Sequence, residues 1–289
     1  MRIGIFGNEY HAEKQNSIQG LFVCLQNRNA EIWVEETFFR SLSESFAVAP
    51  KITGLINGDT FPLDMAFSLG GDGTFLRTAA WVERQPIPVL GINTGHLGFL
   101  ADVCPSEIEK TVEEIFRGEY SIEEKSLLRL ETPAAFPHPY ALNEIAVLKR
   151  DTASMITVSV YLNDEFLTEY LADGLLLSTP TGSTAYNLSV NGPIILSQSE
   201  SFVLSPVAPH SLNMRPLVIP DDYKIRLQVE SRQKNFLISL DGRSTVFPSG
   251  SEFLIGKADF TLKVIKRPEQ NFYDTLRKKL LWGKDVRTT

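Results

Sequence analysis

The residues with the clearest chemical potential form the segment Gly70-Gly71-Asp72-Gly73-Thr74, which directly follows the apolar run 65–69. In α/β proteins, a short buried strand that stops at two glycines and gives way to helical spacing presents backbone N–H groups to phosphate. Asp72 adds a carboxylate, which accepts a hydrogen bond from a hydroxyl or holds a metal ion. The segment therefore predicts a site where a hydroxyl meets a phosphoryl group. The alternative is a tight turn with a helix-capping aspartate.

A parallel sheet is expected to carry the segment Gly70–Thr74, the glycine loop. Apolar runs at 2–7, 32–34, 65–69 and 87–93 alternate with segments of helical spacing, which is the pattern of strands covered by helices on both faces. Ligands of such sheets bind beyond the carboxyl ends of the strands. The glycine-rich segment 93–99 follows the last of these strands, so it is expected to lie near the glycine loop.

The predicted secondary structure changes after residue 119. From there to about residue 267 the sequence consists mostly of short β-like runs, with Asn163-Asp164 as an expected hairpin turn. These runs lie at 127–130, 141–148, 156–162, 166–176, 224–229, 236–240 and 260–265. We therefore predict an α/β domain over 1–119, an all-β, sandwich-like domain over 120–267, and a terminal amphipathic helix within 268–289 that packs back on the first domain.

Two polar segments interrupt the β pattern of the second domain. Asn143-Glu144 lies inside an apolar run, where an amide and a carboxylate side by side suit adenine edges or ribose hydroxyls. The alternative is an exposed edge strand. Asp173 begins the second segment, in which hydroxyl residues crowd around Gly182 and Tyr186 offers a flat ring for a nicotinamide or adenine. A linker or a helix cap is the alternative there.

Composition limits the possible functions. The chain has 289 residues, enough for about two domains, and a net charge of −7. An acidic balance argues against nucleic acid or an anionic membrane as a partner. The N-terminus enters a strand without a signal-peptide pattern and no apolar run reaches membrane-spanning length, so we expect a cytoplasmic protein. Cys24 and Cys104 lie far apart, which indicates buried packing residues rather than a disulfide or zinc site.

Taken in order, these motifs resemble those of the NAD kinases. The resemblance includes Gly70–Gly73, the segment 91–100, Asn143-Glu144 and the segment 173–189, and it extends over nearly the whole chain. It also includes 209–212 and 215–217. The Gly-Gly-Asp-Gly motif is similar in diacylglycerol kinases, sphingosine kinases and phosphofructokinases, whereas the block Thr-Pro-Thr-Gly-Ser-Thr-Ala-Tyr at 179–186 is far more specific.

The resemblance implies ATP-dependent phosphorylation of the adenosine-ribose 2′-hydroxyl of NAD to NADP, with a divalent cation such as Mg²⁺. It implies a Rossmann-like first domain, a β-sandwich second domain, a site in the cleft between them, and a homodimer or homotetramer. Asp72 would be the catalytic base. The contacts to NAD would fall on Asp72, Gly73, Arg77, Asn143, Glu144, Asp173, Thr184, Ala185, Tyr186, Asn187, Leu188 and Ser189.

Several positions qualify this picture. A carboxylate of ordinary pKa is a weak base for a sugar hydroxyl, so the main role of Asp72 is predicted to be orientation of the nucleophile. Arg77 is predicted either to pair with a phosphate or to be a solvated helix residue. Ser154 stands where many relatives carry a His or Arg, and Leu171 stands where some carry a basic residue. Arg243 follows a strand and either reaches the ligand or belongs to a hairpin turn.

Two other functions remain open from the residues. A diacylglycerol-type lipid kinase shares the glycine motif, but it needs an apolar or basic membrane-facing surface that the acidic chain does not indicate. A non-catalytic dinucleotide sensor is the second alternative, and the retained Asp72 argues against it.

Overall fold

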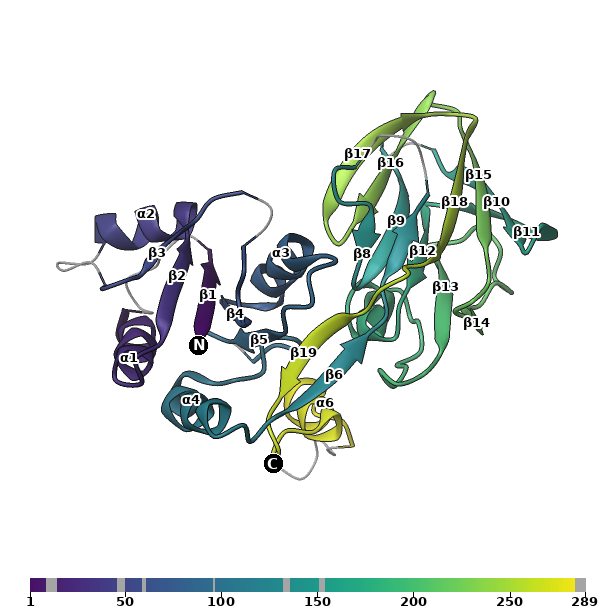
Figure 1. The fold of residues 1–289 in the computed structure, drawn as a ribbon. Helices are drawn as coiled ribbons and strands as arrows, with labels where there is room; N and C mark the ends of the chain where they lie inside the picture. Colours follow the sequence, from purple (N-terminus) through teal and green to yellow (C-terminus); the bar gives the residue numbers. More distant parts are fainter. Residues whose placement is uncertain are drawn as a thin grey trace. The chain divides into compact units, whose positions relative to one another are not determined.

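The computed structural model shows two compact units (Figure 1). One comprises Met1–Glu124 and Lys263–Thr289, and the other comprises Lys125–Leu262. The structure describes residues 1–8, 15–45, 50–58, 61–95, 97–131, 136–150 and 154–283.

A seven-stranded sheet forms the centre of the first unit, in the order β3-β2-β1-β4-β5-β19-β6. Its strands are β1 (Arg2–Gly7), β2 (Glu31–Glu35), β3 (Gly54–Ile56), β4 (Met65–Leu69), β5 (Val89–Ile92), β6 (Ser121–Lys125) and β19 (Leu262–Lys266). The pairs from β3 through β19 are parallel. All five residues of β4 are buried, as expected of a central strand covered on both faces. The predicted α/β architecture is confirmed.

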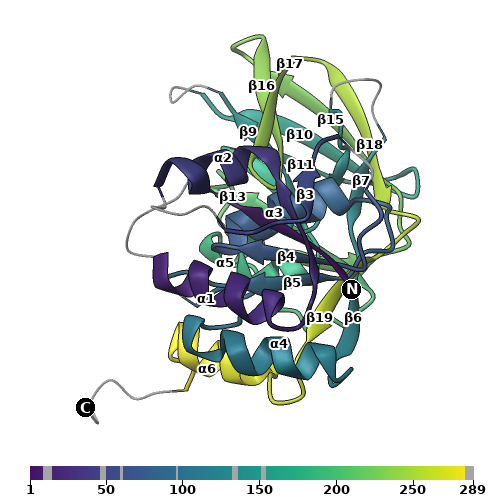
Figure 2. The same cartoon turned by 60° about the vertical axis from the view of Figure 1, so that its left-hand side comes forward.

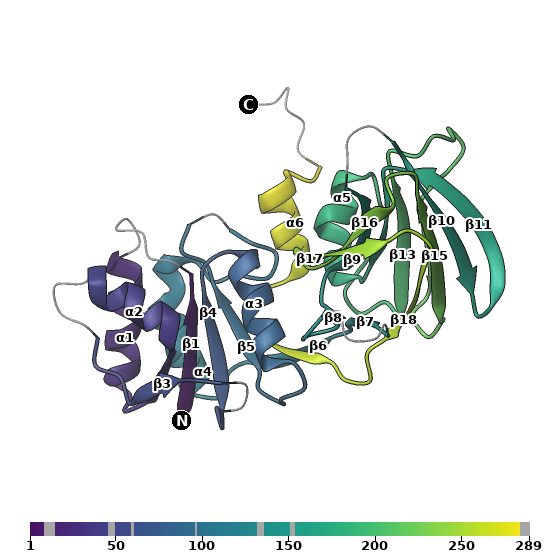
Figure 3. The ribbon, with the colours of Figure 1, turned by 90° about the horizontal axis from the view of Figure 1, so that it is seen from above.

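Helices cover both faces of this sheet. They are α1 (Gln15–Gln26), α2 (Glu36–Ser45), α3 (Asp72–Val82), α4 (Ile108–Phe116) and α6 (Phe272–Leu280). The apolar stripes of α1 and α4 share one core cluster with Ile3, Ile5 and Phe67 of the sheet, and the two helices pack against each other (Figure 2). The helix α3 packs on β1, β4 and β5 with side chains outside that cluster, so it covers the opposite face (Figure 3).

The second unit is built from two six-stranded sheets, in the orders β11-β10-β15-β18-β7-β8 and β14-β13-β12-β9-β16-β17. The first contains β7 (Leu128–Leu130), β8 (Tyr140–Ala141), β10 (Ile156–Leu162), β11 (Glu165–Ala172), β15 (Ile225–Ser231) and β18 (Ser251–Lys257). The second contains β9 (Glu144–Lys149), β12 (Gly174–Ser178), β13 (Ser201–Val207), β14 (Leu217–Pro220), β16 (Asn235–Leu240) and β17 (Arg243–Pro248). Pairing within both sheets is antiparallel.

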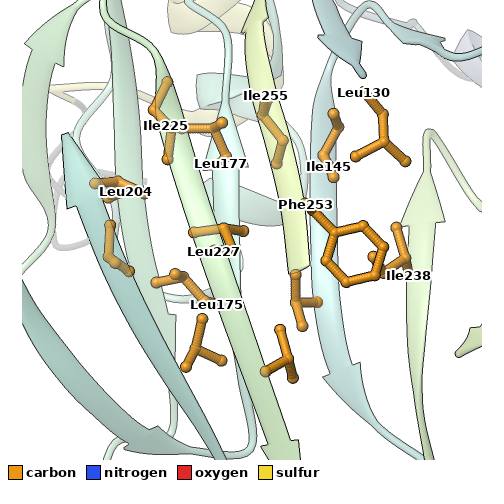
Figure 4. Packing of buried hydrophobic residues seen from close by; sticks show 14 of the residues in the cluster. Leu130, Ile145, Leu175, Leu177, Leu204, Ile225, Leu227, Ile238, Phe253 and Ile255 are labelled. Carbon is orange, nitrogen blue, oxygen red and sulfur yellow. The ribbon is translucent and has the colours of Figure 1, made fainter. Parts of the chain in front are cut away.

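One apolar core joins the two sheets. Leu227, Phe253 and Ile255 from one sheet and Leu175 and Ile238 from the other belong to the same buried cluster (Figure 4). Alternating burial along β10 and β15 places one side chain in two in this core. The expected β-sandwich is therefore present.

One detail differs from the sequence-based expectations in this unit. The run 166–176 is two strands, since β11 and β12 lie in different sheets. The change of sheet occurs at Asp173, a polar residue between the end of β11 at Ala172 and the start of β12 at Gly174. The hairpin at Asn163-Asp164 is confirmed, and both residues adopt positive φ, as its two-residue turn requires.

The compact units change at 124/125 and 262/263, whereas the sequence predicted domain boundaries at 119/120 and 267/268. The difference comes from β6 and β19, which lie next to each other at the end of the seven-stranded sheet. The composition of β6 and β19 resembles that of the β-rich part of the chain. The sequence of a short strand does not indicate which sheet the strand joins. After β19 the chain forms α6, which belongs to the first unit.

Candidate functional site

The glycine loop leads directly from β4 into α3, with Gly71 as the N-cap residue. Asp72 makes no capping hydrogen bond, so the simple helix-cap interpretation does not hold. Its carboxylate instead accepts three hydrogen bonds from consecutive backbone N–H groups: Phe99 (2.9 Å, Oδ2), Leu100 (2.9 Å, Oδ1) and Ala101 (3.0 Å, Oδ1). Asp72 thereby holds the loop after β5 against the start of α3.

Lys279 of α6 also reaches this carboxylate, with its Nζ atom 3.3 Å from Oδ2 of Asp72. Burial raises the pKa of Asp72, but the three backbone N–H groups and the Lys279 charge outweigh it and hold that pKa below its ordinary value. Asp72 is therefore a fixed negative charge and a weak proton acceptor. This supports orientation of a hydroxyl rather than full proton abstraction.

Gly98 is needed for this arrangement. A Cβ atom at this position would lie 2.1 Å from Oδ1 of Asp72, inside any allowed contact. By contrast, a Cβ atom at Gly71 or Gly73 would meet nothing within 4 Å. The first turn of α3 therefore leaves room for another group to approach its backbone.

A cavity of about 720 Å³ lies beside α3. Gly7 and Asn8 at the end of β1, Ser41 of α2, and Arg77 and Trp81 of α3 contribute to its lining. The strand order 3-2-1-4-5 reverses direction between β1 and β4, and open α/β sheets bind ligands at this switch point. The volume falls within the range of nucleotide-sized pockets. Arg77 donates to the carbonyl of Gly7 at 3.4 Å and lies at the edge of the cavity.

In the second unit, Asn143 and Glu144 lie at the start of β9, where a carboxylate again accepts hydrogen bonds from three consecutive backbone N–H groups, a second backbone cradle. The carboxylate of Asp241 accepts hydrogen bonds from the N–H groups of Leu142 (2.7 Å), Asn143 (2.9 Å) and Glu144 (3.0 Å). Asn143 is only 7% exposed, so the edge-strand alternative does not hold for it. Asp241 therefore fixes the backbone that carries both predicted contact residues.

Glu144 lies in a strongly perturbing environment. Burial and then the negative charge of Asp241 raise its pKa to about 7, while a hydrogen bond from the backbone N–H of Tyr186 opposes the rise. Oε2 of Glu144 and Oδ1 of Asn143 are buried, and neither meets a hydrogen-bond donor among the described residues. Unpartnered buried acceptors are costly and need an explanation. Hydroxyl or amino groups of a ligand would satisfy both.

The segment 179–189 forms a 3₁₀ turn, Thr181–Thr184, followed by the short helix α5 (Tyr186–Ser189). Asn187 is fully buried, and its side chain bonds to the carbonyls of Ser183 (3.2 Å) and Pro193 (3.1 Å) and to the hydroxyl of Ser205 (2.6 Å). Its amide therefore acts within the chain. The linker alternative does not hold, because these contacts give the segment a fixed structure.

The remaining predicted contacts of this segment differ in exposure. Tyr186 and Ser189 are exposed, and Thr184, Ala185 and Leu188 are half-buried. Gly182 approaches the backbone so closely that a Cβ atom there would lie 2.0 Å from the carbonyl oxygen of Asn143. This contact sets the turn against Asn143-Glu144, and the Tyr186 N–H reaches the carboxylate of Glu144. The structure therefore brings Asn143, Glu144 and the segment 184–189 together.

Asp173 is set apart from that group. The antiparallel register pairs Ser178 with Glu144 and Gly174 with Leu148, so Asp173 lies at the opposite end of β9 and β12. The separation is about 16 Å along the strands. Its carboxylate pairs with Lys149 at 2.6 Å. Within one chain, Asp173 therefore does not join Asn143-Glu144.

The structure places three residues whose roles were open from the sequence, Arg243, Ser154 and Leu171. Arg243 donates to the carbonyls of Leu240 (3.2 Å), His138 (2.8 Å) and Tyr140, which is an internal role in a turn. Ser154 and Leu171 line a smaller cavity of about 430 Å³ on the first β-sheet of the second unit. His96, in the loop after β5, lies outside the described residues.

Among the described residues, no three His, Cys, Asp or Glu side chains cluster as a metal site requires. The Asp72 oxygens already accept three N–H bonds and face an ammonium group, which fits a metal ligand poorly. A Mg²⁺ ion held by phosphate oxygens and water needs few protein ligands. The residues present therefore fit a cation that arrives on a polyphosphate better than a resident metal.

Two residues of these sites were not found from the sequence. Lys279 lies 207 positions from Asp72, and Asp241 lies 97 to 99 positions from the N–H groups that it binds. The spacing of residues within one helix or strand cannot predict contacts over such separations. The one available signal for Asp241 is its turn sequence Asp241-Gly242 after an apolar run.

The chain is similar to known proteins along its whole length. The sequence model of the ATP-NAD kinase N-terminal domain matches residues 3–120, and that of the ATP-NAD kinase C-terminal domain matches residues 142–267. The NAD kinase of Bacteroides fragilis is 49% identical over 289 residues, covering 99% of this chain and 100% of the relative. The NAD kinase of Porphyromonas gingivalis is 46% identical over 288 residues, covering 99% of each chain.

Solved structures share the fold. Yeast NADH kinase, solved in complex with NADH, matches with a TM-score of 0.86 and 23% identity, covering 100% of this chain and 90% of that one. An NAD kinase from Archaeoglobus fulgidus, solved in complex with ATP, matches with a TM-score of 0.77 and 25% identity, covering 97% and 99%. Among the described helices of this chain, none is both long and apolar enough to cross a bilayer.

Proposed function

Because this chain belongs to the ATP-NAD kinase family and phosphorylates NAD with ATP, we propose that the phosphoryl group passes to the adenosine-ribose 2′-hydroxyl and gives NADP. The observation that carries the proposal is the pair of buried, unpartnered acceptors on Asn143 and Glu144. A dinucleotide offers hydroxyl and amino donors that would satisfy both. The contacts to NAD proposed for this chain remain those predicted from its sequence, Asp72, Gly73 and Arg77 included, but the side-chain amide of Asn187 is already used within the chain.

Asp72 is proposed to touch the hydroxyl that is phosphorylated and to orient it. Its lowered pKa keeps it ionised, so it accepts the hydroxyl hydrogen bond without taking the proton early. In a loose phosphoryl-transfer transition state, the hydroxyl proton becomes acidic late, so orientation suffices. The cation is proposed to be Mg²⁺ that enters with ATP as part of the substrate and neutralises phosphate charge.

The cavity at the switch point is proposed to hold the nucleoside of ATP. It lies beside the first turns of α3, whose backbone is open at Gly71 and Gly73, and Arg77 stands at its edge. Ser41 contributes a small side chain to the opposite wall. Ser41→Trp should therefore fill the cavity and raise KM for ATP about tenfold or more, with KM for NAD within about twofold. An unchanged KM for ATP would mean that the nucleoside of ATP binds outside this cavity.

We also propose that the enzyme works in the cytoplasm as a homodimer or homotetramer. Free Cys24 and Cys104 suit a reducing compartment. Asp173 would need a second copy to join Asn143-Glu144, since about 16 Å of strand separates them within one chain. Light scattering on the purified protein measures the subunit number, and a monomer with full activity would exclude the oligomer as a requirement.

The deciding experiment is a coupled assay of the purified protein with NAD, ATP and Mg²⁺, in which NADP is read by an NADP-specific dehydrogenase. We expect NADP to form from NAD, and no product from an NAD analogue that lacks the adenosine 2′-hydroxyl. Phosphorylation of that analogue would move the reaction to another hydroxyl. NAD binding without NADP formation would support the dinucleotide sensor, and phosphorylation of diacylglycerol in vesicles would support the lipid kinase.

A further inference from the structure

The helix α6 carries Lys279, which contacts the glycine loop of the first unit. Nζ of Lys279 lies 3.3 Å from Oδ2 of Asp72 and 4.4 Å from the centroid of the Phe99 ring. The ammonium group therefore sits between the carboxylate and an aromatic face, both of which attract a cation. It belongs to the same cluster of groups as the N–H cradle of Asp72.

The position of α6 is set by contacts near its start. Lys266 at the end of β19 pairs with Asp102 at 2.6 Å, and Gln270 donates to the Asp102 carbonyl at 3.0 Å. The Phe272 ring packs against the Phe99 ring at 6.4 Å. These contacts join α6 to the loop that Asp72 binds, so Lys279 is held near Asp72 by the fold rather than by its own ion pair.

The ion pair itself adds little to stability. Asp72 already has three backbone donors, and the Lys279 side chain is 31% exposed, which places the pair where water and salt weaken it. Lysine carries its charge on a flexible four-carbon stem. The ammonium group can therefore leave the carboxylate for a stronger anion at small cost.

The glycine loop lacks the positive charge that a phosphate site needs. Asp72 is negative, and Arg77 donates toward Gly7 rather than toward the start of α3. The N-terminal backbone of α3 is open at Gly71 and Gly73. Among the described residues, Lys279 places its ammonium group in contact with this loop, at the carboxylate of Asp72.

We propose that Lys279 is a phosphate-binding residue of the kinase site, whose ammonium group exchanges Asp72 for the phosphate chain of the bound donor. This inference rests on the proposed function above. In the protein without nucleotide, Lys279 screens the charge of Asp72. With nucleotide bound, Lys279 supplies the positive charge and Asp72 is free to accept the hydroxyl of NAD.

The test is the kinetics of Lys279→Met beside Lys278→Met, which removes the same charge from the preceding, exposed position of α6. We expect Lys279→Met to raise KM for ATP about tenfold or more and to leave KM for NAD within about twofold, whereas Lys278→Met changes neither. Lys279→Arg should recover part of the loss, because it restores the charge with a different shape.

A second readout separates binding from turnover. Calorimetry of a non-hydrolysable ATP analogue with the same proteins should show the same loss of affinity for Lys279→Met. An unchanged affinity and KM for ATP would overturn the proposal, as would equal losses for ATP and NAD. If Lys279→Met lowers the Tm, Lys279→Gln replaces it in the same titrations. Failure of the proposed function would appear separately, as absence of NADP formation by the unaltered enzyme.

Discussion

Asp72 and Asp241 hold the backbone in the same way, but their pKa values are shifted in opposite directions. Each accepts hydrogen bonds from three consecutive N–H groups, 99–101 for Asp72 and 142–144 for Asp241. For Asp72, the N–H groups and Lys279 outweigh burial and lower the pKa. For Asp241, burial outweighs the three N–H groups and the Arg243 charge, and the pKa is raised.

The difference shows that a backbone cradle alone does not decide what a carboxylate does. At the glycine loop the three N–H groups keep a charged carboxylate in place, which we propose orients the reacting hydroxyl. Beneath β9 the cradle fixes Asn143-Glu144, and the Asp241 charge contributes to the pKa of about 7 at Glu144. One carboxylate is proposed to touch substrate, and the other positions two residues that are proposed to touch it.

The sharpest test of this comparison is Asp72→Asn. The substitution removes the acceptor charge, so kcat should fall about 100-fold or more while the Kd for NAD stays within about threefold. The introduced amide would also face N–H donors, which should lower the free energy of unfolding by about 1–3 kcal/mol. Coupled kinetics, NAD titration and urea unfolding measure the three quantities. Loss of NAD binding in proportion to the loss of rate would refute the orienting role.

Asp241→Asn should act on stability and NAD binding rather than on the chemical step. Buried N–H groups lose charge-assisted acceptors, so the free energy of unfolding should fall by about 3 kcal/mol. The substitution also removes a negative charge beside Glu144, which should lower the pKa of Glu144 and move the pH midpoint of NAD binding downward.

Urea unfolding and calorimetric titration of NAD from pH 5 to 8 check both effects. Asp222→Asn, at an exposed position of the same unit, is the control for a lost charge. A kcat that falls as far as in Asp72→Asn, with NAD binding unchanged, would contradict a positioning role for Asp241.

Glu144→Gln should change how stability depends on pH. The folded protein holds a proton on Glu144 up to about pH 7, whereas the unfolded chain releases it near pH 4.5. The unaltered protein should therefore lose stability through this group as the pH rises from 4.5 through 7. The substitution removes that loss, so its relative stability should increase by about 2 kcal/mol across this window.

Urea unfolding of both proteins at pH 5 and pH 7.5 measures the difference. Glu169→Gln, on the edge strand β11, removes an exposed carboxylate of the same unit and should show no such trend. Parallel pH profiles for Glu144→Gln and the unaltered protein would mean that Glu144 is not perturbed.

Features that depend on local patterns could be predicted from the sequence. The strand 65–69 and the glycines after it fix the loop, because a buried run and a turn are properties of neighbouring residues. The strand β13 was not predicted from the sequence. Its Pro206 has no N–H group, a feature that is unusual in a central strand, yet Pro206 pairs opposite Leu175. The contacts of Lys279 and Asp241 depend on topology, which residue spacing does not encode.

The return of the chain through β19 also affects the order of folding during synthesis. The strand β19 lies between β5 and β6 in the seven-stranded sheet, but the ribosome makes it after the whole of Lys125–Leu262. The second unit is continuous and is free to fold first, whereas the first unit must wait for its last strand and helix. A nascent chain stopped at residue 262 would leave the sheet edge of β5 exposed to chaperones and would carry no Lys279. Lys279 therefore reaches Asp72 only after synthesis has passed the whole second unit.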